Sequence, residues 1–344
     1  MLKLERVDPD RVDWDALDSF PDRNVYQTRE WVSFTAKTQQ ANPVLASVKD
    51  EGETVGLFTG LIVRPYGIRI LGSPFRGWTT AYLGFNLRAG VSRRAAVEAL
   101  VPFAFDRLRC MHIELRDRHL EVEDVEGIGF ANSPKTIFEV DLRPSEDDLF
   151  ARMTSACRRC IRKAENVGVS IEEADDLEFA NEYYTQLQDV FAKQSLVPTY
   201  DTDRVAELIR HLQPTGRLLL LRARNDKGEC IATGIFPAMN RTMYFWGGAS
   251  FREYQILRPN ESLMWYAMRY WKARGIEWLD LGGGAAYKRK YGTVEVPVPF
   301  FRISRFRVIS SARRLAKRGF RLRQAALGRL VSSRTRSTLG NDAS

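Results

Sequence analysis

The sequence has few of the residues from which metal and thiol sites are most often built. Its 344 residues include four cysteines and three histidines. Cys157 and Cys160 form one C-x-x-C motif, but a zinc site needs a second pair of ligands, and no histidine or further cysteine lies near this one. We therefore expect no metal site, and we expect the two cysteines to pack as small apolar residues on a helix.

Long hydrophobic runs are also missing. No segment approaches the roughly 18 consecutive apolar residues that a membrane-spanning helix needs. The four leucines at 218–221 have only the length of a core strand. The first residues, MLKLERVDPD, are charged and lack the apolar centre of a secretory signal. These absences predict a cytoplasmic protein.

Several well-known catalytic and nucleotide-binding motifs are absent. The sequence has no G-x-S-x-G, no H-x-x-x-H and no cysteine and histidine at a recognisable catalytic spacing. Its glycine cluster at 282–284 is not followed by the G-K-[ST] of a triphosphate-binding loop. Hydrolase, metalloenzyme and triphosphate-binding interpretations are therefore disfavoured.

Negative charge is scarce in one part of the chain only. The net charge is +9, but residues 302–344 hold twelve Lys and Arg against the single acid Asp342. The rest of the chain has 40 basic and 42 acidic residues and is close to neutral. This distribution argues against a DNA-binding role for the whole protein and sets the last segment apart.

Several segments of the sequence show helical periodicity. Residues 145–168 open with Ser145 as a plausible N-cap, carry acids in the first turn and meet Gly168 at the end. At 100° per residue one face of this helix holds Leu149, Met153, Ala156, Cys160, Ala164 and Val167. Further helices are predicted at 91–109, 177–194, 202–212 and 260–275, the last capped by Asn260.

The order of elements repeats along the chain. Residues 42–115 predict three strands, a long helix and a strand, and residues 217–281 predict the same order. A further strand is predicted in TVEVPVPFFRIS, residues 293–304. We expect an α/β (α+β) protein of two related units, 1–134 and 135–308, each a mixed, mostly antiparallel sheet flanked by helices, followed by a tail at 309–344.

Three segments, in this order, carry a family resemblance: MTSACRRCIRKAENVGVSIEEAD, then GGASFREYQILRPNESLMWYAMRYWKARGIEWLDLGGG, then YKRKYG. Together with YQTREW at 26–31, they resemble the FemAB-like, BioF2-like branch of the Gcn5-related N-acetyltransferase (GNAT) superfamily. The similarity spans residues 25–305. It implies two tandem GNAT-like domains and transfer of an acyl or aminoacyl group to an amine.

The resemblance also implies a choice of donors and acceptors. The expected acceptor is an amine of a cell-envelope or polysaccharide precursor, as a small molecule or linked to a lipid. The donor is acyl-CoA or aminoacyl-tRNA. The loop REYQILRPN lacks the glycines with which acetyl-CoA-dependent relatives bind pyrophosphate. The alternative is therefore a non-catalytic binding protein, or a tRNA-dependent aminoacyltransferase of peptidoglycan bridge formation.

The stretch DLGGGAAYKRKYG at 280–292 holds the two candidate catalytic residues. Lys288 occupies the family's "F-K-x-x-F-G" lysine position, and its ammonium suits a phosphate or a developing negative charge in the transition state. A solvated basic turn is the plainer alternative. Asp280 ends the preceding strand and could accept the proton of the amine, or it could only orient the glycine loop.

The same stretch contains candidate substrate-binding residues. Gly282 and Gly283 follow the carboxyl end of a strand, where ligands of open α/β sheets collect. Lys290 adds a second ammonium, and Tyr291 could stack on a base or sugar.

Four more candidates lie on helices. Arg158, Arg159 and Arg162 could donate bidentate hydrogen bonds to a phosphate or carboxylate, although a charged helix face is more often only solvated. Asn260 opens the helix that precedes the glycine cluster. Glu261, which follows it, is expected only to complement the helix dipole.

The basic tail has the pattern of an amphipathic helix, with apolar residues at 308/309, 312, 315/316, 319/320, 326/327 and 330/331. Contact with an anionic membrane surface, on the inner face of the membrane, is the favoured interpretation. RNA binding and packing on the protein's own body are the alternatives.

Overall fold

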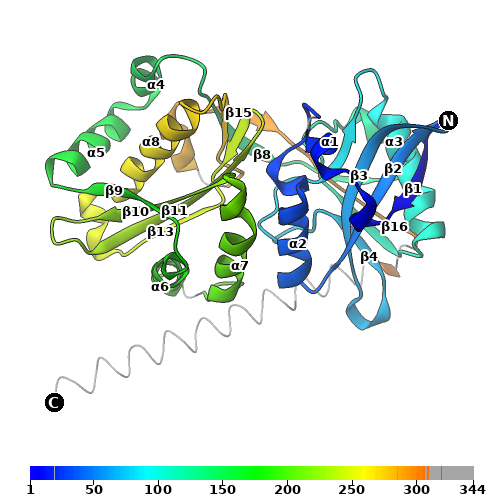
Figure 1. Ribbon diagram of the computed structural model, residues 1–344, viewed down its shortest axis with the longest axis horizontal. Coiled ribbons are helices and arrows are strands. Elements are labelled where there is room, and N and C mark those ends of the chain that lie inside the picture. Colours follow the sequence, from blue (N-terminus) through cyan, green and yellow to red (C-terminus); the bar gives the residue numbers. More distant parts are fainter. Residues whose placement is uncertain (19, 195, 285, 307, 310–318, 320–344) are drawn as a thin grey trace.

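The computed structural model describes residues 1–309, except 19, 195, 285 and 307, together with Gly319. Within this part of the chain the strands form two eight-stranded sheets. Figure 1 shows the two units side by side, with α2 (Arg29–Thr38) and α7 (Thr202–Leu212) packed together between them. No helix among the described residues is long and apolar enough to span a membrane. The predicted tail lies, apart from Ile309 and Gly319, outside the described residues.

The first unit contains one sheet in the order β1-β2-β3-β4-β6-β16-β7, with β5 also paired to β3. Its strands are β1 (Lys3–Val7), β2 (Asn42–Asp50), β3 (Glu53–Val63), β4 (Ile70–Ser73), β5 (Gly84–Leu87), β6 (His112–Leu115), β7 (Ala131–Ser133) and β16 (Phe300–Ser304). Its helices are α1 (Trp14–Asp18), α2 and α3 (Arg93–Pro102), the last continued by a π-helical turn at Phe103–Arg107.

The second unit has the sheet order β15-β8-β14-β12-β11-β10-β9, with β13 also paired to β11. Its strands are β8 (Thr136–Asp141), β9 (Ser170–Ala174), β10 (Leu218–Arg224), β11 (Cys230–Met239), β12 (Thr242–Tyr244), β13 (Gly247–Ser250), β14 (Trp278–Asp280) and β15 (Val294–Pro297). Its helices are α4 (Glu146–Arg152), α5 (Ser155–Asn166), α6 (Glu178–Ala192), α7 and α8 (Pro259–Lys272), with 3-10 helices η7 (Glu253–Leu257) and η8 (Ala286–Tyr291).

Strand β10 shows why helices cover both faces of the second sheet. Side chains alternate along a strand, so Leu219 and Leu221 join the cluster under α5 and α8, whereas Leu218 and Leu220 join the cluster under α6 and α7. A run of four leucines therefore fits a strand that is buried on both faces.

The predicted repeat is confirmed, except that each unit has four strands before its helix where three are predicted. In the first unit β3 pairs with both β4 and β5, and after α3 the strand β6 lies parallel to β4. In the second unit β11 pairs with both β12 and β13, and after α8 the strand β14 lies parallel to β12. The two mixed, mostly antiparallel sheets also confirm the predicted fold class.

One strand joins a different sheet from the one predicted. The segment 293–304 forms two strands: β15 pairs with β8 in the second sheet, and β16 pairs with β6 and β7 in the first. The expectation that residues 300–304 belong to the second unit is therefore wrong. In the second sheet, β8 pairs antiparallel with the outer edge of β14. In the first sheet, β16 pairs with β6 in the same way, so β6 has no open edge.

The predicted helix 145–168 is two helices, and beyond Met153 its predicted apolar face is buried only at Ala164. Chain direction changes at Met153–Thr154, where Thr154 caps α5 through a hydrogen bond from the amide of Cys157. The break shifts the helical phase. The buried residues of α5 are Cys157, Ile161 and Ala164, while Ala156 and Val167 are exposed.

Candidate active site

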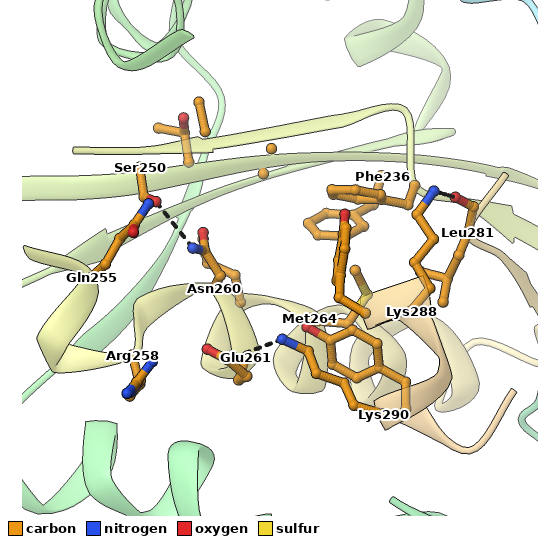
Figure 2. Close-up of a pocket in the computed structure, with 18 of the residues that line it drawn as sticks. Phe236, Ser250, Gln255, Arg258, Asn260, Glu261, Met264, Leu281, Lys288 and Lys290 are labelled. Carbon is orange, nitrogen blue, oxygen red and sulfur yellow. Dashed lines mark hydrogen bonds and ion pairs between the residues drawn. The ribbon is translucent and has the colours of Figure 1, made fainter. Parts of the chain in front are cut away.

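A cavity opens where two parallel strands of the second sheet separate. β12 pairs with β14 from Thr242 to Tyr244, but the continuing strand β13 follows β11 instead. Beyond that point a cavity of about 520 Å³ lies between β13, η7, the start of α8, the end of β14 and η8. Figure 2 shows its polar residues on both sides and Phe236 and Met264 on its wall.

Lys288 is held at this cavity by main-chain carbonyl groups. Its Nζ donates to the oxygen of Leu281 at 2.6 Å and to that of Gly283 at 2.7 Å. The residue is 8% exposed, and burial lowers the pKa of its ammonium, while the nearby carboxylate of Asp280 acts in the opposite direction. An ammonium has three protons, and no third acceptor for it exists among the described residues. The remaining proton is available to a ligand.

A partly buried ion pair lies at the start of α8. Lys290 Nζ lies 2.7 Å from Glu261 Oε1, and both side chains line the cavity. Glu261 therefore forms an ion pair, whereas its position in the sequence predicts only that it complements the helix dipole. The sequence carries no signal of this pair, because its members are 29 residues apart. The cavity's described lining holds three cations, Arg258, Lys288 and Lys290, against the one carboxylate, so its charge favours an anionic ligand.

Two other predicted residues, Tyr291 and Asn260, also line this cavity. Tyr291 is 3% exposed, and burial raises the pKa of its phenol well above the ordinary value. Asn260 lines the cavity and donates to Ser250 Oγ at 3.0 Å. It is not the N-cap of α8, which is Arg258 in the left-handed conformation, because Pro259 occupies the first helical position.

Asp280 is buried between the two units and is not part of the cavity lining. Its Oδ2 accepts from the hydroxyl of Tyr82 at 2.6 Å, and its Oδ1 accepts from the amide of Gly282 at 2.6 Å. Burial raises the pKa of this carboxyl, although both hydrogen bonds oppose that effect. The contacts are those of a residue that orients the glycine loop, which was the plainer of its two predicted roles.

Gly282 and Gly283 form that loop but do not line the cavity of Lys288. Gly282 has φ +68°, and a Cβ on Gly283 would lie 2.9 Å from the carbonyl oxygen of Thr136. Glycine is therefore required at both positions by conformation or by space. Their contribution to this site is the carbonyl of Gly283 that holds Lys288.

The three predicted arginines of α5 lie away from the cavity. Arg158 donates to the carbonyls of Ala151 and Met153 and so caps the end of α4. Arg162 lies over the ring of Phe150, with 5.3 Å from its guanidinium carbon to the ring centre. Arg159 is exposed. None of the three is among the described residues that line this cavity.

Comparison with known proteins identifies the second unit. Residues 151–289 match the model of the "Acetyltransferase (GNAT) domain" family, a range that contains α5, β13, α8, β14 and Lys288. These residues form a GNAT domain. No curated protein gives a significant match to this sequence.

Solved structures extend the likeness to both units. The crystal structure of FemX is similar with a TM-score of 0.70 at 15% identity, covering 87% of this chain and 96% of FemX. The structure of L-PGS from Bacillus licheniformis gives 0.51 at 12% identity, covering 88% and 93%. A tandem GNAT protein from the clavulanic acid biosynthesis pathway gives 0.52 at 12%, covering 88% and 98%. At these identities the likeness establishes the tandem GNAT fold, which the sequence predicts.

Proposed function

We propose that the protein is an acyltransferase that moves an acyl or aminoacyl group onto an amine of a cell-envelope or polysaccharide precursor. The observation that carries this proposal is Lys288, buried and held by two carbonyls at a cavity between the separating strands of a GNAT domain. A lysine without ion-pair partner among the described residues is costly to bury, so a ligand that receives its free proton would explain its position.

The chemistry needs little more than positioning and charge stabilisation. A neutral amine attacks the activated carbonyl, the C–N bond forms, and the carbonyl oxygen becomes an oxyanion. The Lys288 ammonium donates its remaining proton as a hydrogen bond to that oxygen. Collapse of the intermediate breaks the bond to the leaving group, and the departing thiolate or alkoxide takes up the proton that the amine nitrogen loses. Such a donor is worth on the order of 100- to 1,000-fold in rate.

In this cavity, side chains are better placed to bind a phosphate-bearing donor than the main-chain amides of a glycine loop are. The segment that precedes α8 is the 3-10 helix η7, and the amides of Gln255 and Arg258 donate to carbonyls within it. These amides are not available to a diphosphate. Arg258 and Lys290 supply positive charge at the same place. Acyl-CoA would bind here through these two side chains, and aminoacyl-tRNA is the other donor that the family resemblance implies.

A screen of donors by thermal unfolding tests the proposal. Acetyl-CoA, longer acyl-CoAs, nucleotide sugars and aminoacyl-tRNA are each added to the wild type, Lys288→Ala and Arg289→Ala. Arg289 is the matched control, because it neighbours Lys288 but pairs with Glu295 outside the cavity. We expect one donor to raise the Tm of the wild type and the control, and to raise that of Lys288→Ala much less.

The second candidate is a binding protein that has kept the fold without the reaction. It is favoured by Glu261, whose carboxylate stands in the first turn of α8 where an anionic ligand would otherwise meet the helix. Absence of any response in the donor screen supports this candidate and contradicts the acyltransferase.

A further inference from the structure

The connection between β3 and β4 forms a tip that projects from one end of the first sheet (Figure 1). It consists of residues 64–69, RPYGIR, with the short 3-10 helix η3 (Pro65–Gly67) at its centre. Tyr66 is fully exposed, and Ile68 is exposed as well. No ring contact or hydrogen bond holds the side chain of Tyr66 among the described residues. The tip therefore presents an aromatic and an aliphatic side chain to the surroundings.

The backbone of Tyr66 is strained. Its φ of +52° lies in the left-handed region, which a bulky aromatic residue rarely adopts and in which glycine is at ease. Neither packing nor a hydrogen bond in the described part of the chain compensates this strain. Strain at an exposed residue of this kind points to a role outside the folded unit itself.

Two further segments lie beside the tip. The amide of Met111 donates to the carbonyl of Arg69 at 2.8 Å, and the amide of Arg305 donates to the carbonyl of Met111 at 3.0 Å. The chain that follows Arg305 adds two exposed apolar side chains, Phe306 and Val308. Four exposed apolar residues thus belong to neighbouring segments at one end of the first sheet.

Arginines accompany these apolar side chains. Residues 64–69, 109–111 and 305–309 contain five arginines and no acid. Arg64 and Arg109 are exposed and have no ion-pair partner in the part of the chain that the structure describes. The three segments, called the tip surface below, therefore combine apolar side chains with positive charge.

The carboxylate of Asp106 borders the tip surface without cancelling its charge. Arg305 lies 3.2 Å from this carboxylate and neutralises it. The unpaired arginines of the tip surface are therefore left to attract an anionic partner.

This combination fits the boundary of an anionic membrane. Tyrosine is enriched where lipid meets water, and arginine can keep its alkyl chain on apolar surface while its guanidinium reaches the head groups. A protein partner fits less well, because a projecting tip offers little area for a folded surface to pack against. RNA fits less well too, because Ile68 and Val308 have no ring on which a base could stack.

The basic segment 302–344 begins at the same end of the sheet. β16 starts at Phe300 and ends at Ser304, next to the first residue of β6. The tail that is predicted to contact a membrane therefore continues from the tip surface, and both can meet one lipid surface. Two weak membrane contacts on one chain reinforce each other, because binding of the first raises the local concentration of the second.

We propose that the tip surface contacts an anionic membrane, with Tyr66 and Ile68 inserted among the lipid head groups. The tail supplies most of the attraction, and the tip fixes which end of the protein faces the lipid. A few apolar residues alone bind a membrane only marginally, so the tip needs the tail. This contact does not depend on the acyltransferase reaction.

Sedimentation of the full chain with vesicles of phosphatidylglycerol and phosphatidylcholine tests the apolar part of the contact. The double variant Tyr66→Ser, Ile68→Ser removes both inserted side chains. Ile256→Ser is the matched control, since Ile256 is an exposed isoleucine of the second unit. We expect the affinity to fall about tenfold or more in the double variant and to stay within about twofold in the control.

The same assay tests the charged part. Arg64→Gln and Arg109→Gln should each lower the affinity about fivefold, the effect of one basic residue near anionic lipid. Arg159→Gln is the control, because Arg159 is exposed on α5 and likewise has no ion-pair partner among the described residues. We expect it to bind like the wild type, and we expect vesicles of phosphatidylcholine alone to bind much less of any variant.

Insertion itself is measured with a polarity-sensitive fluorophore on Tyr66→Cys. Anionic vesicles should shift its emission to shorter wavelength, whereas the same label on Ile256→Cys should not respond. The labelled wild type corrects for the four native cysteines. Because every substituted side chain is exposed, the unfolding transition is expected to stay in place in all variants.

Three results would overturn the proposal. The first is wild-type affinity in the double variant, or an equal loss in Ile256→Ser. The second is unshifted emission at position 66 while the protein sediments with the vesicles. The third is failure of the full chain to bind anionic vesicles, which would leave the tip surface to a protein or RNA partner.

Discussion

The hydroxyl of Tyr82 donates a 2.6 Å hydrogen bond to Oδ2 of Asp280 across the boundary between the two units. Both residues are buried. The rings of Tyr26 and Tyr244 pack beside Tyr82, with ring centres 6.3 and 6.5 Å away. Because Asp280 also accepts from the amide of Gly282, this bond ties the first unit to the glycine loop.

Replacing Tyr82 by Phe removes only the hydroxyl and leaves a buried carboxylate with one donor fewer. We expect the free energy of unfolding to fall by about 1.5–3 kcal/mol, the range for hydrogen bonds to charged groups. Chemical denaturation measures this change. Tyr66→Phe is the control, since Tyr66 is fully exposed and its replacement is expected to be neutral. Equal effects of the two substitutions contradict the assigned bond.

Asp280→Asn removes a titrating group whose pKa the fold raises above its ordinary value of 3.8. Between that value and the folded pKa, the native state binds more protons than the unfolded state, so stability falls as the pH rises. The stability that the protonated carboxyl of Asp280 contributes is complete below pH 3.8 and is lost above the pKa of the folded state. Denaturation across this window should show the wild type losing stability relative to Asp280→Asn with rising pH, at no more than about 1.4 kcal/mol per pH unit. A constant difference contradicts the raised pKa.

Gly292 ends the segment that carries Lys288 and allows it to pack closely on α4. Its φ is +76°, and a Cβ there would lie 3.0 Å from the carbonyl oxygen of Arg152. Gly52 has φ +93° with nothing within 4 Å of such a Cβ. Alanine at either position meets the strain of the left-handed conformation, about 1–2 kcal/mol. We expect Gly292→Ala to lower the unfolding free energy by roughly 1–3 kcal/mol more, and an equal loss at Gly52 contradicts the close packing.

The basic tail predicts a membrane contact that can be tested without its structure. Deleting residues 311–344 should abolish binding to liposomes with anionic lipids while the unfolding transition stays in place, because each basic residue near such a surface adds about 1 kcal/mol. Neutral liposomes are the control for charge. Binding that survives the deletion argues against the tail as the membrane contact.

The sequence predicts the architecture well because the elements of the repeat follow from local residue patterns. Alternation, helical periodicity and turn residues predict strands, helices and their order, and the two sheets follow from that order. The position of β16 was not predictable in this way. Its residues 300–304 have the pattern of an ordinary strand, and only the open side of β6 in the folded protein decides which sheet they join.

The site is less visible in the sequence, because its contacts join distant residues. Tyr82 and Asp280 are 198 positions apart. The pair Glu261–Lys290 likewise depends on the fold. Lys288 could be selected from the motif alone, but the carbonyls that hold it could not. The failure of the predicted face of α5 has a local cause, since the break at Thr154 restarts the helical phase.

The role of Lys288 is tested most directly by transfer kinetics, once the donor screen has identified a donor. The kcat/KM of acyl transfer to an amine is compared among the wild type, Lys288→Met and Arg289→Met. We expect Lys288→Met to lose on the order of 100-fold or more, mostly in kcat, because its ammonium stabilises the oxyanion. Arg289→Met should stay close to the wild type. Transfer by Lys288→Met at the wild-type rate would contradict the proposed active site.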